Sequence, residues 1–239
     1  MKRPARVPLQ LSESLHQRLS AYALAASAAG VGALAWTQPA EAKIVYTPTH
    51  LVFKQSSNIT RHIDLNHDGI PDFRFLHFHQ SSFNSFSSAF YGGGSNKSNL
   101  IMGRDTGCPY PGYCVFALTK GANVGPGQGF QREESLFAVA HGPSSFLNGY
   151  WGNGGKGVKN GYAGLQFVIN GKLHYGWARL TVTLGAGNQA HSIRAVITGY
   201  AYETIPNKPI IAGKTHGRDE ATLGRLAQGA SSMSNREKP

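Results

Sequence analysis

Asp64, Asp68 and Asp72 stand four residues apart in the segment DLNHDGIPDF, which begins at Asp64. Asn66 adds a side-chain oxygen between the first two carboxylates, and Gly69 permits a sharp turn. Ca²⁺ prefers about six to eight oxygen ligands, and oxygen donors at alternate positions wrap a chain around one ion. Three carboxylates this close would repel one another without a cation. The predicted Ca²⁺ ligands are the side chains of Asp64, Asn66, Asp68 and Asp72 and the backbone carbonyl of Ile70.

The same loop resembles the DxNxDGxxD calcium loops of dockerin, thrombospondin type 3 and related extracellular repeats. It departs from the EF-hand pattern because Phe75 stands where that motif has a bidentate acid. We therefore expect a static strand–loop–strand site, with the side chain of Ile70 anchoring the loop in the core and further ligands supplied elsewhere or by water. A metal-free turn remains the alternative, because Asp, Asn and Gly are ordinary turn residues.

Two histidines offer a second candidate metal pair. His77 and His79 alternate on a short aromatic segment, so they share one face of a strand, which zinc could use. No third ligand is identifiable from spacing. We expect both to be partly buried structural histidines.

No motif of a common enzyme class is present: the sequence has no GxSxG, HExxH or GxxxxGK[ST]. A glycan hydrolase or lyase would need facing carboxylates. The candidates for this alternative, a carbohydrate-active enzyme, are Glu133, Glu134 and Glu203. We expect a protein without catalytic activity.

The first 42 residues have the parts of a secretory signal peptide: a basic start, an apolar run over 21–36 and Ala-Glu-Ala at 40–42. The alternative, a transmembrane anchor, needs a longer and more apolar run. We predict a secreted bacterial protein, periplasmic or extracellular, with no stable membrane span after cleavage. In an oxidising compartment, Cys108 and Cys114 around a Pro/Gly turn predict a local disulfide rather than a metal pair.

Residues 43–213 predict an all-β domain, a jelly-roll-like β-sandwich with long Gly/Ser-rich loops, because short alternating apolar segments are separated by turn residues. The clearest signal is Asn170-Gly171 between two alternating runs, which is typical of a β-hairpin. The Ser/Asn/Gly-rich stretch 80–99 is expected to be a loop. Residues 214–239 are expected to form a mobile tail.

The formal net charge is +11, but the basic residues are scattered singly, so we expect no nucleic-acid partner. Tyr150 and Trp151 lie in a glycine-rich segment, and exposed aromatic rings can stack on sugars. They are a possible platform for an extracellular polysaccharide or a cell-envelope component, with core packing as the alternative.

The AEAKIVYTP segment, the DLNHDG loop, and HYGWARL followed by GYAYET resemble a group of exported bacterial proteins with no assigned activity, some related to proteins with C-terminal sorting signals. This resemblance supports export and a β architecture only. The sequence as a whole predicts a secreted, calcium-stabilised β-sandwich that acts as a binding or structural module.

Overall fold

The structure is a computed structural model that describes residues 43–54, 57–82, 85–104, 113–131, 135–141, 146–185 and 192–217. The predicted signal peptide and most of the predicted tail lie outside these ranges. The described residues form strands and one short 3₁₀ segment, η1 (Asn153–Gly155). The strands are β1 (Ile44–Phe53), β2 (Ile59–Ile63), β3 (Phe73–Ser82), β4 (Ser85–Gly94), β5 (Leu100–Arg104), β6 (Cys114–Val115), β7 (Asn123–Val124), β8 (Phe130–Gln131), β9 (Ser135–His141), β10 (Phe146–Asn148), β11 (Val158–Ile169), β12 (Lys172–Leu184), β13 (Ile193–Glu203) and β14 (Ile210–Ile211).

The predicted all-β class is confirmed, but the two separate sheets of a jelly-roll sandwich are not seen. The main strands form one hydrogen-bonded ladder in the order β1-β13-β12-β11-β5-β6-β9-β4-β3-β2. Strand β5 joins the two halves, since Leu100 and Ile101 pair with β11 while Gly103 and Arg104 pair with β6. Gly103 permits this crossing, because a Cβ there would lie 2.3 Å from the carbonyl oxygen of Cys114.

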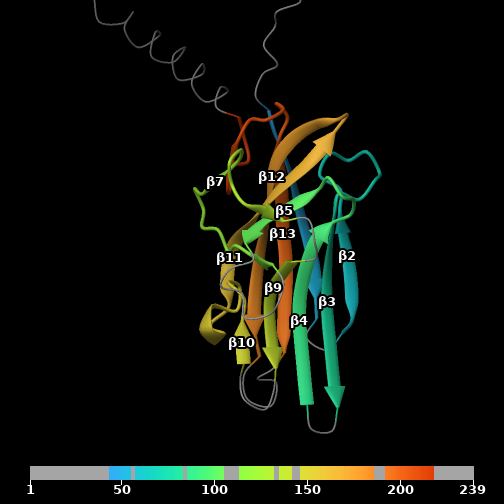
Figure 1. Ribbon diagram of the computed structural model, residues 1–239, viewed down its shortest axis with the longest axis vertical. Helices are drawn as coiled ribbons and strands as arrows, with labels where there is room; N and C mark the ends of the chain where they lie inside the picture. The colour runs from blue at the N-terminus through green and yellow to red at the C-terminus, as the bar shows by residue number, and fades with distance from the viewer. Residues whose placement is uncertain are drawn as a thin grey trace, which may run out of the picture. The chain divides into compact units, whose positions relative to one another are not determined.

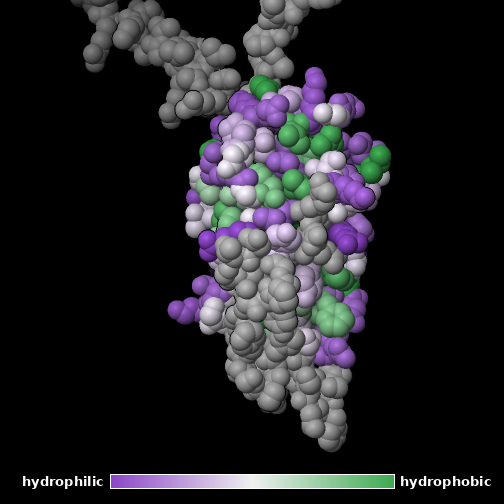
Figure 2. Space-filling model, viewed as in Figure 1, coloured by the Kyte–Doolittle hydropathy of each residue, from purple (hydrophilic) through white to green (hydrophobic). Residues whose placement is uncertain are grey.

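The two halves of the ladder pack against each other through aromatic side chains. Phe53 of β1 lies edge-on to Phe90 of β4, with ring centroids 4.9 Å apart, and Phe73 of β3 meets Phe167 of β11 at 6.5 Å. All four rings are fully buried. Figure 1 shows β2, β3 and β4 side by side along one edge of the view and β11 at the opposite edge. On the face drawn in Figure 2, hydrophilic residues surround small, separate hydrophobic groups.

The predicted hairpin is confirmed. Strand β11 ends at Ile169 and β12 begins at Lys172, and these two residues are register partners. Asn170 and Gly171 have φ angles of 49° and 75°. Both angles are positive, as a type I′ turn requires, and this turn matches the natural twist of paired strands.

The expectation of a loop over residues 80–99 is wrong for most of that stretch. Strand β4 occupies Ser85–Gly94 and pairs along its length with β3 and also with β9. Its small residues allow close packing: a Cβ on Gly92 would lie 2.7 Å from the ring of Phe137. Composition alone suggested a loop, because residues that permit such an approach are also common in turns.

Candidate metal loop between strands β2 and β3

The acidic segment forms the turn that connects β2 to β3. The backbone N–H of Asp72 donates to the carbonyl of Ile63 at 2.9 Å and so closes the loop at its base. Gly69 has a φ of 85°, which confirms the turn expected there. Leu65 is fully buried and anchors the loop, whereas the side chain of Ile70 is 66% exposed. The expectation that Ile70 anchors the loop is therefore wrong: Leu65 fills the core position, and the Ile70 side chain points to solvent.

Two of the carboxylates are held by N–H groups of the loop itself. Asp64 accepts hydrogen bonds from the backbone N–H groups of His67 at 2.7 Å and Gly69 at 2.8 Å. Asp68 accepts from the backbone N–H of Ile70 at 2.8 Å and from the Nδ2 of Asn66 at 2.9 Å. These bonds lower the pKa of Asp68, with the Asn66 bond as the larger cause. The Asp68 carboxylate therefore stays charged at neutral pH, and the loop N–H groups hold both side chains in place.

Asp72 is the buried member of the loop, with a relative exposure of 6%. Its carboxylate accepts from the N–H of Leu65 at 2.8 Å and from the Nδ2 of Asn99 at 3.2 Å. Burial raises the pKa of Asp72, and the charges of Asp64 and Asp68 raise it further. The three carboxylates are thus close enough to interact, and the negative charge on the buried one is disfavoured.

Residues from β1 and β13 form the wall beside this loop. The ring of His67 stacks on Tyr200 with centroids 6.2 Å apart, and its Nε2 lies 3.0 Å from the hydroxyl oxygen of Thr47. The pKa of Tyr200 is raised by burial and then by the charge of Asp64. The sequence pattern did not reveal Thr47, Tyr200 or Asn99 as neighbours of the loop, because long-range pairing alone brings them there.

The donor types of the loop fit calcium, since all are carboxylate, amide or carbonyl oxygens. Each carboxylate oxygen that already accepts one hydrogen bond keeps a second lone pair. Within the described ranges, however, no three His, Cys, Asp or Glu side chains are arranged around one metal position. An ion would therefore require the side chains of Asp64 and Asp68 to turn from the loop N–H groups toward a common centre.

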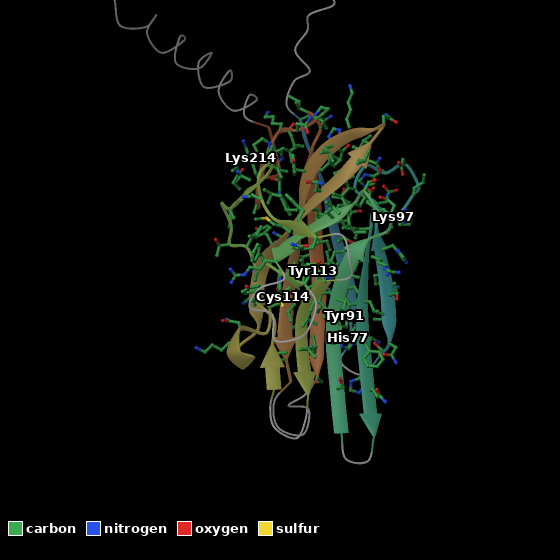
Figure 3. The ribbon with its side chains drawn as sticks, in the orientation of Figure 1. His77, Tyr91, Lys97, Tyr113, Cys114 and Lys214 are labelled. Atoms are coloured by element: carbon green, nitrogen blue, oxygen red, sulfur yellow. The ribbon has the colours of Figure 1, made fainter. Side chains whose placement is uncertain are left out.

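His77 has a structural role, as expected. It is fully buried, and its Nδ1 lies 2.8 Å from the carbonyl oxygen of Ser57. A carbonyl can only accept, so Nδ1 carries the proton and Nε2 accepts from the hydroxyl of Ser88 at 2.9 Å. The same hydroxyl oxygen accepts from the N–H of Ile193 at 3.2 Å. Both ring nitrogens are in use, which leaves His77 no lone pair for zinc. Figure 3 labels His77 among the side chains of the sheet.

The acids named for catalysis gain no support. Glu203 is 3% exposed and forms an ion pair with Lys208 at 3.4 Å. The N–H of Ile205 also donates to it at 3.2 Å. Glu133 and Glu134 lie outside the described residues. Glu203 is therefore occupied in holding the end of β13.

Trp151 does not form an exposed platform. It is fully buried, with its ring centroid 5.4 Å from that of Phe137. Its neighbour Tyr150 is half-buried and accepts a hydrogen bond from the Nε of Arg104. The predicted stacking surface is thus reduced to Tyr150, because the core takes up the indole. Cys114 is buried in β6, and its predicted disulfide partner, Cys108, lies outside the described residues.

No protein-family model, curated protein or solved structure matches the chain. The resemblance to exported bacterial proteins therefore stays a prediction. In the part of the chain that the structure describes, no helix has the length and apolar character needed to span a membrane.

Proposed function

We propose that this chain is an exported all-β protein that calcium stabilises and that acts as a binding or structural module. The observation that supports calcium most directly is the position of Asp72. Its carboxylate is buried, and two further carboxylates within the same turn raise its pKa. A divalent cation would neutralise this charge where the protein alone disfavours it.

The position of the loop gives a calcium ion a stabilising role. Both ends of the loop continue into paired strands, and Leu65, near its start, anchors it in the core. Asn99 donates to the backbone carbonyl of Asp72 at 3.0 Å and accepts from the N–H of Val168 at 3.3 Å. An ion that fixes Asp72 would therefore also strengthen the contact of β3 with β11. Binding that favours the folded state alone raises its stability.

A binding or structural module suits this chain better than a carbohydrate-active enzyme. The loop carboxylates are held by backbone N–H groups, and Glu203 is held by Lys208. Neither arrangement presents a proton donor and a base facing each other across a cleft. Export rests on the sequence of residues 1–42.

Calcium is expected to raise the melting temperature of the purified protein. At about 100 times its dissociation constant the ion adds about 2.7 kcal/mol, which corresponds to about 5–10 °C for a chain of this size. Thermal unfolding followed by circular dichroism, with calcium and with chelator, measures the shift.

The matched variant for this experiment is Asp68→Asn. The amide retains the shape and an oxygen for the N–H of Ile70, and its NH₂ group can donate to the Oδ1 of Asn66 once that side-chain amide turns over. The chelator-treated variant should therefore unfold near the temperature of the chelator-treated parent. The calcium-induced shift should be largely lost. Magnesium at equal concentration controls for ionic strength, because it favours a smaller and more rigid site. Equal melting temperatures of the parent with calcium and with chelator would rule out the proposed role of the ion.

A further inference from the structure

A hollow with a volume of about 610 Å³ lies beside Tyr150, on a different part of the molecule from the acidic loop. Its walls come from three segments: residues 116–120, Tyr150 with the η1 region, and the first residues of β11. The volume is within the usual range for small-molecule sites. Residues 116–120 thus combine with residues from the later stretch 150–161 to form one concave surface.

One wall of the hollow is aromatic. Phe116 and Tyr150 both line it, with ring centroids 5.4 Å apart. The guanidinium carbon of Arg104 lies 5.8 Å from the Phe116 centroid and 5.5 Å from that of Tyr150. These contacts hold the pair in place. Apolar faces of sugar rings pack well on such aromatic side chains.

The lining of the hollow also contains cationic and polar side chains. Lys120 and Lys159 line it, and neither forms an ion pair with a carboxylate of the described residues. The carboxylates in the described ranges belong to Asp64, Asp68, Asp72 and Glu203, and none of them lines the hollow. Among the described residues, therefore, no carboxylate neutralises the two lysines at the hollow, and their charge would favour an anionic ligand.

Two asparagines complete the lining, and both have left-handed backbone conformations. Asn153 has a φ of 46° and Asn160 a φ of 53°. Asn153 donates its Nδ2 to the carbonyl of Gly157 at 3.1 Å, which fixes its side-chain oxygen. The backbone N–H of Asn160 donates to the hydroxyl of Thr181 at 3.1 Å, but its side-chain amide makes no hydrogen bond to another described residue. Both the donor and the acceptor of that side chain can therefore meet sugar hydroxyls.

We propose that this hollow binds a saccharide that carries carboxylate or sulfate groups. The aromatic pair packs against the apolar face of a sugar ring, the lysines bind the anionic group, and the asparagines form hydrogen bonds with hydroxyls. The inference rests on the binding-module part of the proposed function and names its ligand class. It does not depend on calcium, because no residue of the acidic loop contributes to the hollow.

The test is calorimetric titration of the purified protein with an oligogalacturonate, a sulfated heparin fragment and a neutral cello-oligosaccharide. The first two arms separate carboxylated from sulfated ligands. We expect at least one of them to bind and the neutral one to bind more weakly. Lys120→Ala/Lys159→Ala should lower the affinity for the anionic ligand by about tenfold for each cation lost. Asn160→Asp, which places a carboxylate in the hollow at constant side-chain size, should also lower this affinity.

The matched control is Lys97→Ala/Lys172→Ala, which removes the same charge from exposed positions outside the hollow. It should leave the affinity within about twofold, since rim charges far from a ligand add little. Equal losses for both lysine pairs would show general attraction to a cationic protein and would overturn the proposal, as would binding of neither anionic ligand. Titrations repeated in chelator, below the melting temperature, should give the same affinity. Failure of the calcium proposal therefore would leave this result unchanged.

Discussion

Replacement of His77 by alanine is expected to lower the free energy of unfolding by about 3–5 kcal/mol, as for other large buried rings. The imidazole is fully buried and links Ser57 to Ser88, whose hydroxyl also accepts from Ile193 of β13. The variant loses the ring volume and leaves the Ser57 carbonyl and Ser88 hydroxyl without their partner. Urea unfolding at neutral pH measures the change. His77→Gln, which can form part of the same network, should lose less.

The pH dependence of the free energy of unfolding provides the control for the structural role assigned to His77. Burial lowers the pKa of His77 below the ordinary histidine value of 6.5, and the nearby His79 contributes in the same direction. As the pH falls through 6.5, the unfolded chain therefore takes up more protons than the folded chain. The free energy of unfolding should be constant above this pH and decrease below it, by at most about 1.4 kcal/mol per pH unit. A decrease of the same size in His77→Gln would contradict the assignment.

Replacement of Gly94 by alanine is expected to destabilise the protein by about 3 kcal/mol, at the upper end of the usual range for overpacking. A Cβ at this position would lie 1.9 Å from the carbonyl oxygen of Asn99, so the backbone there must move. Asn99 holds both the carbonyl and the carboxylate of Asp72. The variant should therefore also lose part of its response to calcium.

Gly127→Ala is the comparison for that variant. Gly127 has a φ of 78°, and a Cβ there would meet no atom within 4 Å. Its substitution adds only the left-handed backbone cost, about 1 kcal/mol. Chemical denaturation of both variants gives the two values. Equal losses of stability in the two variants would show that a Cβ at position 94 does not clash with Asn99.

Local signals in the sequence were sufficient for the all-β class, the hairpin at Asn170-Gly171 and the turn at Gly69. Each depends on residues adjacent in the chain, whose backbone preferences act without tertiary context. The strand β4 was missed for the opposite reason. Its serines and glycines favour turns locally, and only the neighbouring strands β3 and β9 select the extended form. The continuity of the ladder through β5 is equally a tertiary property.

The candidate site was only partly accessible from sequence. Spacing placed Asp64, Asp68 and Asp72 in one turn, because that depends on chain order alone. The role of Asn99 depends on a separation of 27 residues that no local pattern records. The sequence left two interpretations of Trp151 open, and the indole is in the core; the expectation for Ile70 was wrong, since its side chain is in solvent. Hydrophobicity does not tell which apolar residue of a loop fills the available core position.

The most direct test of the proposed calcium site is calorimetric titration of calcium into protein that has been stripped with chelator and dialysed. We predict a single binding event per chain that is abolished in Asp68→Asn, with magnesium giving a much weaker signal. Binding that is unaffected by the substitution, or no heat of binding in the parent protein, would contradict a calcium site formed by the turn between β2 and β3.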